Sequence, residues 1–566
     1  MSSHLEAIPL DVLTQVAFFT IDGSPIATLD ALLQLMLSSR TLHRLLSIRT
    51  CPQLYARIFR AQFDLKGHYR RSQQHAKTTS CLASELQERR RVLRRIRLGQ
   101  IVAHHLLDDL WMVYLMLLES DALNETHLHA AGVGGWVLRV IQEHQARAGG
   151  EIDEQVLSLA ISVACLVLSH NHISSLPTED RNQVLNILRP FTTSSPKYLS
   201  TNVSGAVGRR ILLSPHGSHD RVPSQLNFPH KNSYEVDKHP KHTSYFSRFT
   251  ISAPNLLSGS VFLTFAFKEV TPLQVPPHLP PTRAAAIAAE RHGPTMEDFV
   301  AITQRRTPLV ADSFHQCHSR ESVLDHAREQ RRPSRSDVHD EDFYRIARHL
   351  DVPAETWEHQ AYIPGLLTGV WEGSYMVAPS STCPSPTGSP GAEVDQDFLC
   401  RQPIQFRLEE NLSFTPWLPL PIEPQDAFDG HVLRNLCASE EESMKGIQFS
   451  DGNTAKTYHY EPFRLSGASE SGRDPRHALD VVITGETPRR FEAAWGTYSF
   501  IGRIRLSDGL ISLTRKPKSA GDDGCGTWVF EGYLRSRRTF VGKWGTLGAP
   551  GHEGIGGIFS MSKTAD

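Results

Sequence analysis

Residues 526–544 read GTWVFEGYLRSRRTFVGKW, and we predict two strands within them, over 527–534 and 539–544. Each strand combines a tryptophan with a glycine. Glycine in a strand permits the sharp coiling that a small barrel requires, while a tryptophan beside it fills the space left empty. The run therefore predicts strands of an antiparallel sheet that curls.

The same pattern continues on both sides of this run. Aromatic–glycine clusters recur at 371–375 and 495–498, and Gly, Pro, Asp and Ser interrupt the apolar segments at short intervals. The low-complexity segment PSSTCPSPTGSPG, residues 379–391, is expected to be a flexible loop between strands. Together these features predict an antiparallel β-barrel domain over residues 361–566. Its further strands are predicted at 370–375, 404–408, 481–484, 498–504, 510–514 and 555–561.

The tryptophans of this domain have two interpretations. Each is more simply a part of the barrel core. Alternatively, one barrel mouth lined by arginines and Tyr375 binds a target protein or a small ligand. The sequence Gly369-Val370-Trp371 resembles the Gly-x-Trp motif of lipocalin-like barrels, where a basic residue, here Lys563, covers the tryptophan. The candidate target- or ligand-binding residues are Trp371, Tyr375, Trp495, Arg503, Arg505, Arg515, Trp528 and Trp544.

Upstream of the barrel, the hydrophobic period changes to that of helices. Apolar residues recur at helical spacing over 101–118, 136–144, 152–168 and 184–188, which predicts a helical bundle across residues 66–190. A further helix, beginning near Glu85, is very basic. Its arginines would attract phosphate or an acidic partner, but a solvated face or a local salt-bridge network is the favoured interpretation because no aromatic residues are interleaved. These arginines are Arg89, Arg90, Arg91, Arg94, Arg95 and Arg97.

The composition between these two regions indicates a linker-rich mixed region over residues 191–360. Residues 192–245 are rich in Ser, Thr, Asn, Pro and His, as expected for a long loop. We predict one buried strand at 261–267, followed by prolines that end it. Short helices are predicted at 284–289 and 342–350.

The first 65 residues are expected to form three short helices. Pro9 fits the first helical position, where its missing N–H costs nothing. A second helix begins near Thr28, with a bend predicted near Ser38-Ser39, and Cys51-Pro52 starts the third. Three helices of about 12 residues cannot bury all their leucines in one another, so a spare apolar face would pack on a partner. The simpler alternative is that this face closes against the helices of residues 82–190.

This N-terminal pattern resembles the F-box family. Ile8-Pro9-Leu10-Asp11-Val12-Leu13 followed by Val16 is similar to the F-box opening, Ser39–Leu45 to its second helix, and Cys51–Tyr55 to the entry of its third. Residues 495–561 resemble the C-terminal domain of fungal F-box-containing proteins. The resemblance implies a Skp-type adaptor within a cullin–RING ligase as the partner. The implied adaptor-binding residues are Ile8, Pro9, Leu10, Leu13, Val16, Leu32, Leu33 and Met36.

Composition excludes several other classes of protein. The formal net charge is −2 over 566 residues, so no global attraction to nucleic acid or membrane is expected. The 8 cysteines contain no CxxC pair, which indicates a reduced intracellular protein, cytoplasmic or nuclear. The N-terminus lacks a signal-peptide pattern, and the apolar run at 110–118 is far shorter than the roughly 20 residues that span a bilayer. We find no catalytic, metal-ligand or cofactor motif.

We therefore predict an α+β multidomain protein with a three-helix F-box at 1–65, a helical middle region, and a C-terminal antiparallel β-barrel. Its expected role is the non-catalytic substrate-recognition subunit of an SCF-type ubiquitin ligase, without cofactor or metal. The adaptor would bind the F-box, and an unknown target protein the barrel. The alternative function is a ligand-binding lipocalin-like β-barrel protein whose N-terminal helices are only structural.

Overall fold

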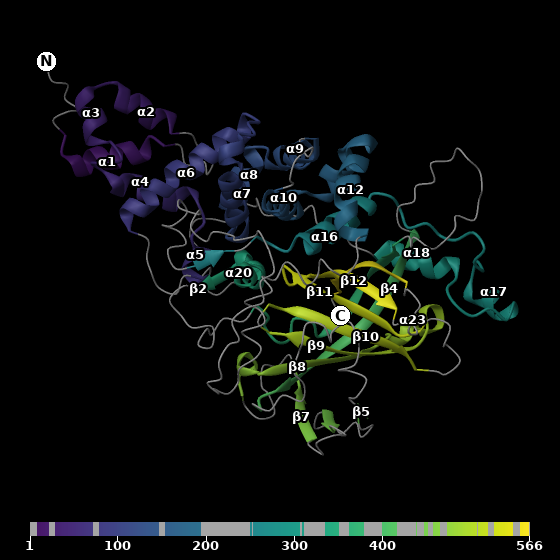
Figure 1. Ribbon diagram of the computed structural model, residues 1–566. Helices are drawn as coiled ribbons and strands as arrows, with labels where there is room; N and C mark the ends of the chain where they lie inside the picture. Colours follow the sequence, from purple (N-terminus) through teal and green to yellow (C-terminus); the bar gives the residue numbers. More distant parts are fainter. Residues whose placement is uncertain are drawn as a thin grey trace, which may run out of the picture. The chain divides into compact units, whose positions relative to one another are not determined.

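The structure is a computed structural model whose described residues fall into two compact units (Figure 1). The helical unit comprises Met1–Ile187 with Asp312–Asp340, and the barrel unit comprises Leu188–Ala311 with Glu341–Asp566. The regions predicted at 1–65 and 66–190 thus lie almost wholly in the helical unit. Most of the linker-rich region predicted at 191–360 lies in the barrel unit. The described residues are 8–21, 29–71, 78–146, 153–193, 249–251, 253–305, 308–310, 334–349, 361–378, 399–415, 437–438, 447–450, 457–464, 473–506, 508–518, 526–546 and 555–564.

The described residues of the N-terminal region form four short helices where the sequence predicted three. The predicted second helix does not bend and continue, but ends before Ser39 and restarts after it. Ser39 adopts an extended conformation with φ −155°, and its side chain accepts a hydrogen bond from the Thr41 N–H. This serine therefore caps a separate helix. The four helices are α1 (Leu10–Phe19), α2 (Asp30–Leu37), α3 (Arg40–Leu45) and α4 (Pro52–Gln62).

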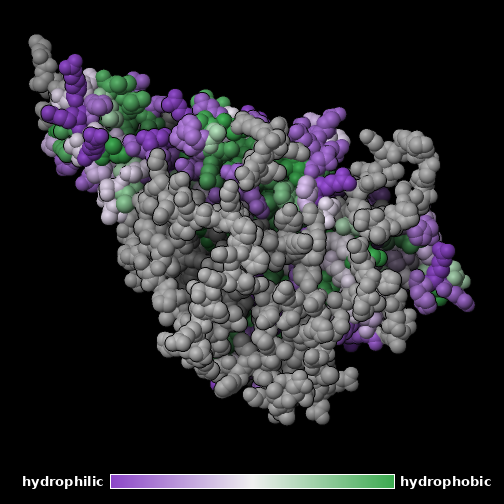
Figure 2. All heavy atoms as spheres, viewed as in Figure 1, coloured by the Kyte–Doolittle hydropathy of each residue, from purple (hydrophilic) through white to green (hydrophobic). Residues whose placement is uncertain are grey.

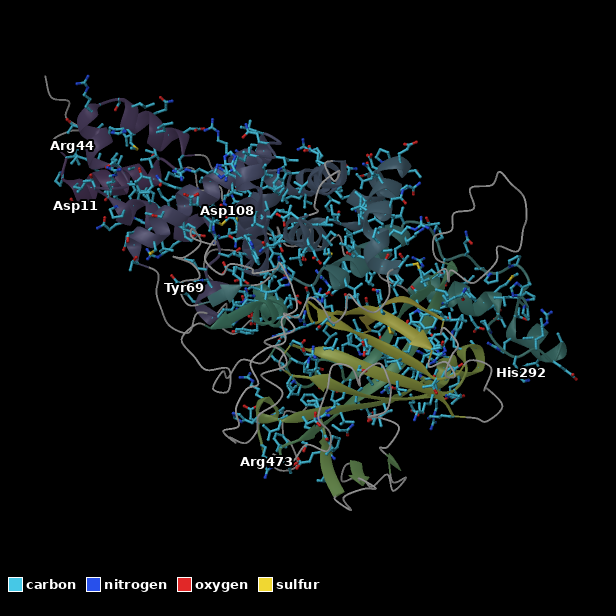
Figure 3. All side chains as sticks on the ribbon, viewed as in Figure 1. Asp11, Arg44, Tyr69, Asp108, His292 and Arg473 are labelled. Atoms are coloured by element: carbon cyan, nitrogen blue, oxygen red, sulfur yellow. The ribbon has the colours of Figure 1, made fainter. Side chains whose placement is uncertain are left out.

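Prolines and charges at the ends of these helices follow the expected preferences. Pro52 is the first residue of α4, as predicted, whereas Pro9 lies one position before α1 as its N-cap. Figure 3 shows Asp11 near the start of α1 and Arg44 near the end of α3, where each charge is favourable to the helix dipole. Leu13 and Ala17 point from α1 into the core.

The described residues that follow, up to residue 193, form further helices, as the apolar periodicity predicted. The apolar run at 110–118 lies within a single helix, and all of its residues are buried. No helix among the residues described combines the length and apolar character needed to cross a membrane. The helices are α5 (Lys66–Arg71), α6 (Thr79–Arg97), α7 (Ala103–Leu118), α8 (Leu123–Ala130), α9 (Val133–Ala146), α10 (Glu154–Val167), α11 (His170–Ser175) and α12 (Thr178–Thr193).

The basic helix, α6, forms a salt-bridge network, the interpretation that the sequence favoured. Arg89 is buried, and its Nη1 donates to Asn124 Oδ1 of α8 at 3.1 Å. Arg95 Nε donates to Asp109 Oδ2 at 2.8 Å. Both guanidinium groups therefore hold helices of the bundle together.

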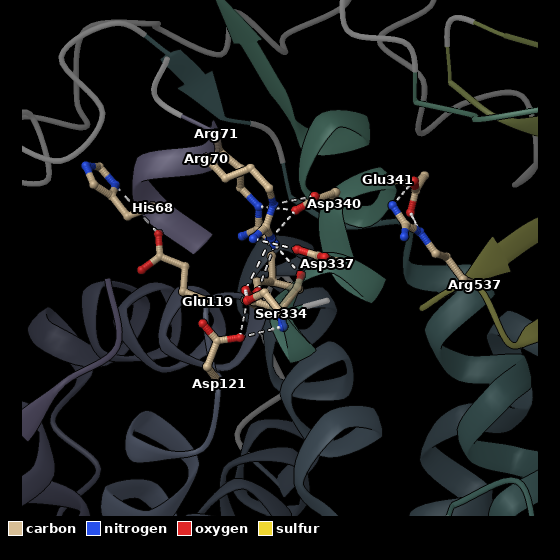
Figure 4. A network of polar contacts seen from close by, with 12 residues as sticks. His68, Arg70, Arg71, Glu119, Asp121, Ser334, Asp337, Asp340, Glu341 and Arg537 are labelled. Carbon is tan, nitrogen blue, oxygen red and sulfur yellow. Dashed lines mark hydrogen bonds and ion pairs between the residues drawn. The ribbon is translucent and has the colours of Figure 1, made fainter. Parts of the chain in front are cut away.

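A second polar network holds residues 334–340 in the helical unit (Figure 4). Arg70 and Arg71 of α5 each donate from Nε to Asp340, both at 2.7 Å. The Ser336 N–H donates to Asp121 Oδ1 at 3.0 Å. Burial acts to raise the pKa of Asp340, but the two arginines outweigh it and lower that pKa. This network anchors the short helix η4 (Arg335–His339).

The barrel unit contains a closed barrel of eight antiparallel strands. Each strand pairs with the next along the barrel, and the last strand pairs with the first. All eight predicted strands are present. The strands are β3 (Gly369–Val377), β4 (Leu399–Ser413), β8 (Asp480–Glu486), β9 (Tyr498–Arg505), β10 (Leu510–Pro517), β11 (Trp528–Arg535), β12 (Thr539–Thr546) and β13 (Gly556–Lys563).

Several short elements of the barrel unit were not predicted. Three strands extend from the side of β4: β7 (Thr457–Pro462), β6 (Ile447–Ser450) and β5 (Cys437–Ala438). A separate two-stranded sheet pairs β1 (Phe249–Ile251) with β2 (Ala347–His349). The predicted loop at 379–391 lies outside the described residues.

The predicted strand at 261–267 is wrong, because this segment belongs to the helix α16 (Leu256–Lys268). The Asn255 side chain accepts a hydrogen bond from the Ser258 N–H at 2.8 Å and caps the helix. Residues 256–267 are all buried, so no polar face marks the helical period. A short apolar run of this kind is ambiguous between strand and helix. Within its own unit, α16 contacts β12 and β13.

The other helices of the barrel unit are short. The predicted helix at 284–289 is confirmed, and the one at 342–350 is confirmed up to residue 346, after which β2 begins. Asp342 and Arg345 anchor this second helix to the β11–β12 turn and the β9–β10 turn. These helices are α17 (Arg283–Ala288), α18 (Met296–Arg305), α20 (Asp340–Ile346), α23 (Arg489–Trp495) and the 3-10 helix η6 (Pro475–His477).

Candidate functional site

The implied adaptor-binding residues divide between the surface and the core. Leu10, Val16 and Leu33 are between 39 and 49% exposed, and Pro9 is also exposed. Ile8 and Met36 are partly exposed. Leu13 and Leu32 lie in the core, so they support this surface from behind and do not form it.

Three apolar residues of the same surface were missed. Val12, Phe19 and Leu37 are 47, 69 and 65% exposed. Val12 and Phe19 share a helical stripe with Val16, at spacings of four and three residues, and Leu37 lies four residues after Leu33. A helical wheel of each helix could have found them. We call Leu10, Val12, Val16, Phe19, Leu33 and Leu37 the exposed apolar face.

This face is exceptional for its concentration of apolar side chains. Its six members are half of the twelve large hydrophobic residues that are exposed among the described residues. On the side drawn in Figure 2, green hydrophobic residues lie among purple hydrophilic ones over the N-terminal helices. Exposed apolar side chains gathered on one part of a protein are a feature of interaction surfaces.

Contacts with α4 and with the core hold α1 in place. Arg57 of α4 donates a hydrogen bond to Gln15, and its guanidinium lies 3.9 Å from the centre of the Phe18 ring. Leu13 and Ala17 are buried on the inner face. Inner contacts therefore fix α1 while its outer stripe stays accessible.

A second candidate site lies in the barrel interior, at the end where β10 finishes and β11 begins. The Arg515 guanidinium lies 4.0 Å from the Tyr498 ring and 3.6 Å from the Trp528 ring. Trp528 in turn stacks on Trp544, with centroids 4.2 Å apart and planes 20° apart. Tyr375 meets both tryptophans edge-on. We call these five residues the Arg515 stack.

The Arg515 stack is the outermost layer of the barrel core. Its members on β9 to β12 are 5–8% exposed, whereas Phe530, Phe540 and Phe559 below them are completely buried. Aromatic side chains fill the interior between the stack and the opposite end. The described residues thus form a packed barrel core.

The opposite end of the barrel is closed by residues 361–368. Glu410, fully buried, accepts hydrogen bonds from the Tyr362 hydroxyl at 2.9 Å and from the Leu367 N–H at 2.6 Å. Trp371 lies at this end and donates from Nε1 to the Leu367 carbonyl at 2.7 Å. Lys563, which the Gly-x-Trp resemblance implied would cover Trp371, lies within β13 as the ladder partner of Trp371, and its Nζ donates to the Leu366 carbonyl at 3.1 Å.

Four of the eight predicted barrel-site residues therefore come together: Tyr375, Arg515, Trp528 and Trp544. Tyr498 completes the group and was missed. The other four do not join them. Trp371 lies at the closed end, and the Trp495 ring packs on Phe299 of α18 at 5.2 Å. Arg503 and Arg505 occupy outward positions of β9, where they bond Asp480 and Asp508, each at 2.7 Å.

The helical unit also has a pocket of about 210 Å³ between α8, α9 and α11. Glu125, His129 and His172 contribute its polar lining, with Gly134 at its edge. Burial raises the pKa of Glu125 to about 7. Within the described ranges, no group of three or more His, Cys, Asp or Glu residues is arranged to hold a metal ion.

Comparison with known proteins yields no relative. The chain matches no family model, no curated protein and no solved structure. By its fold, the molecule consists of a helical unit and a second unit that contains a closed eight-stranded barrel. Its function must be argued from the exposed apolar face and the Arg515 stack.

Proposed function

We propose that this protein is the substrate-recognition subunit of a cullin–RING ubiquitin ligase of the SCF type. The exposed apolar face on α1 and α2 would bind a Skp-type adaptor, and the barrel would bind the target protein. The observation that carries the proposal is the concentration of Leu10, Val12, Val16, Phe19, Leu33 and Leu37 on two short helices.

Energetics favour a protein partner for this face. Each Å² of apolar surface removed from water contributes about 25 cal/mol, so covering six large side chains would make a substantial contribution to association. A standard interface buries about 800 Å² per partner. The aliphatic and aromatic residues of the face are suited to the centre of such an interface. The similarity of residues 8–16, 39–45 and 51–55 to the F-box pattern supports an adaptor of the Skp type.

The barrel supplies a rigid platform for a target. Its interior is packed, so recognition would use the end that carries the Arg515 stack and the surfaces around it. The chain itself would perform no chemistry. Ubiquitin transfer would follow from holding target lysines close to a conjugating enzyme recruited by the ligase, which is catalysis by proximity.

The alternative, a ligand-binding lipocalin-like barrel, is the weaker of the two. It needs a cavity inside the barrel, whereas the described interior is filled by side chains from the barrel strands. It also leaves the exposed apolar face unexplained. A hydrophobic dye titrated into the full chain would reveal such a cavity by saturable binding that Trp371→Ala alters.

The proposal is tested by measuring adaptor binding to the full chain and to variants of the exposed apolar face. The wild-type chain should co-elute with a purified Skp-type adaptor, and Val16→Asp combined with Phe19→Asp should weaken that complex at least about tenfold. Leu98→Asp is the matched control, because Leu98 is 60% exposed at the C-terminal end of α6 and is not a member of the face. Circular dichroism would check that each variant is folded.

Two outcomes would reject the proposal. One is the absence of any complex between the wild-type chain and the adaptor. The other is a complex that survives the double substitution unchanged, or that Leu98→Asp weakens equally, because binding would then not depend on this face.

A further inference from the structure

The pocket between α8, α9 and α11 lies wholly within the helical unit and has a volume of about 210 Å³. A cavity of about 150 Å³ in another protein is large enough to bind benzene. This pocket therefore has room for a small ligand with one branched or cyclic apolar group. Its apolar wall is formed by residues of four helices: Leu117 of α7, Leu128 of α8, Val133 of α9 and Val167 of α10.

Glu125 lies at one end of the pocket, in the first turn of α8. Its carboxyl group is partly exposed and makes no hydrogen bond or close ion pair with any residue that the structure describes. Burial raises its pKa to about 7, with Arg335 acting against the rise and Asp64 and Asp121 adding to it. An ammonium group placed here would stabilise the ionised carboxylate and donate hydrogen bonds to it.

The other end of the pocket is the start of α9, where the chain reads Gly132-Val133-Gly134-Gly135. The N–H groups of residues 133–135 form the first helical turn and have no hydrogen-bond acceptor in the described part of the chain. A Cβ atom on Gly132 or Gly135 would meet no atom within 4 Å, so a ligand can approach the backbone closely. This end therefore offers hydrogen-bond donors to a carboxylate.

The His172 imidazole lies beside the same donors. A Cβ atom on Gly134 would be 3.4 Å from its Cε1 atom, so the ring is in contact with the first turn of α9. Burial and the nearby His129 lower the pKa of His172, so its ring is neutral near pH 7. A neutral imidazole can donate one hydrogen bond to a carboxylate.

We propose that this pocket binds a free amino acid with an apolar side chain. The ammonium group would pair with Glu125, and the carboxylate would accept hydrogen bonds from the first turn of α9 and from His172. The side chain would pack on the apolar wall. Glu125 and Gly132 are about two helical turns apart in sequence, which separates the acidic end of the pocket from the donor end.

A ligand with both charges matches this pocket better than a ligand with one. A simple anion would leave the Glu125 carboxylate unpaired, and a simple amine would leave the donors of α9 without an acceptor. The site uses no residue of the exposed apolar face or of the barrel. The inference therefore goes beyond the proposed function and does not depend on it.

The test measures the binding of leucine to the full chain by isothermal titration calorimetry at about pH 8, where Glu125 is ionised. Three relatives of leucine each lack one of the matched groups. N-acetylleucine lacks the ammonium group and leucinol lacks the carboxylate, and each should bind roughly 10- to 100-fold more weakly. Glycine lacks the apolar side chain and should bind at least about tenfold more weakly.

Substitutions locate the site. Glu125→Gln keeps the shape of the side chain and should weaken leucine about tenfold, whereas Glu154→Gln, at the exposed start of α10, should leave the affinity unchanged. His172→Gln should weaken leucine severalfold. Its control is His170→Gln, because His170 belongs to the same helix but does not line the pocket.

The pH dependence of binding provides a second readout. Protonation of Glu125 removes the charge that pairs with the ammonium group, so the affinity of the wild-type chain should fall about tenfold between pH 8 and about pH 6. Glu125→Gln should lose most of this dependence, because glutamine does not titrate.

Three outcomes would overturn the inference: no saturable binding of leucine by the folded wild-type chain, equal binding of leucine and N-acetylleucine, or full affinity in Glu125→Gln. Circular dichroism checks that each variant is folded. If Glu125→Gln fails to fold, His172→Gln and the pH profile of the wild-type chain take its place, and unchanged affinity in both would overturn the inference. Adaptor binding through α1 and α2 is measured separately and is unaffected by any of these results.

Discussion

Single residues in this protein often combine a charge with deep burial. Arg89 of α6 bonds Glu85 at 3.0 Å, lies 3.6 Å from Glu119, and has its guanidinium 4.9 Å from the centre of the Phe59 ring. Burying an ionised group is unfavourable unless partners replace its water. The arginines of α6 thus differ in role. The buried ones hold the bundle together, whereas Arg94 and Arg97 are exposed to solvent.

We expect Arg89→Met to destabilise the helical unit by about 3–5 kcal/mol, since it leaves Glu85 and Glu119 buried without their cation. The matched control is Arg91→Met. Arg91 pairs with Glu88 on the exposed side of the same helix, where a pair contributes at most about 1 kcal/mol. Urea unfolding followed by circular dichroism measures both variants. Equal losses would show that Arg89 makes no special contribution.

Glu531 makes the stability of the barrel depend on pH. It lies directly opposite Lys543 in the ladder, and burial raises its pKa to about 8 despite the nearby Arg505. The folded state therefore binds this proton more tightly than the unfolded state does. This raised pKa stabilises the folded state. The stabilisation is fully present below the unfolded pKa of 4.5 and is lost as the pH rises to the folded pKa of about 8.

We expect Glu531→Gln to flatten the fall in melting temperature between pH 5 and about 8, because glutamine stays neutral throughout. The variant should be more stable than wild type above about pH 8. Differential scanning calorimetry across this range measures both effects. Parallel pH profiles for the two proteins would contradict the assignment.

At the scale of elements, α1 carries two apolar stripes with different roles. Leu13 and Ala17 bind it to the core, while Val12, Val16 and Phe19 face outward. An amphipathic helix needs only one apolar stripe to fold. The second stripe is therefore available for docking, which is why the proposed function depends on it.

These two stripes should respond differently to substitution. Leu13→Ala should cost about 2–5 kcal/mol, because it leaves a cavity in the core. Phe19→Ser should change the free energy of unfolding by less than about 0.5 kcal/mol. Chemical denaturation measures both variants. A large loss of stability in Phe19→Ser would mean that the folded chain covers this face itself.

At the scale of the barrel unit, closure depends on how closely neighbouring strands approach. Gly532 of β11 and Gly542 of β12 are ladder partners. A Cβ atom on Gly542 would lie 1.8 Å from the Glu531 carbonyl oxygen, so no side chain fits there. The glycines that the sequence showed as regular punctuation are thus the points where the sheet coils most tightly.

We expect Gly542→Ala to destabilise the barrel by at least about 2 kcal/mol, because the backbone must move to relieve the overlap. Gly545→Ala, on the same strand, is the control. Its Cβ would lie 3.8 Å from the nearest atom, the Ile555 carbonyl oxygen. Thermal unfolding monitored by tryptophan fluorescence compares the two variants. A tolerated Gly542→Ala would show that the strands can separate locally at little cost.

Local patterns were sufficient to predict the eight barrel strands and most of the helices, because alternation, helical period and turn residues act within a few residues of one another. The strands β5 and β6 carry too few residues for such a pattern, β7 (TYHYEP) has no aliphatic residues that alternate with polar ones, and α16 has no polar face to reveal its period. The break at Ser39 was signalled by a capping residue, but it was interpreted as a bend.

Only the tertiary structure shows on which side of its strand or helix a residue lies. Arg503 and Arg515 have the same side chain on adjacent strands, yet the first bonds Asp480 outside the barrel and the second lies between rings inside it. Likewise, Leu13 and Val16 both belong to the resemblance, but only Val16 remains exposed. The reason is physical. Secondary structure follows from short-range backbone and side-chain preferences, whereas burial follows from long-range packing between segments that lie far apart in the chain.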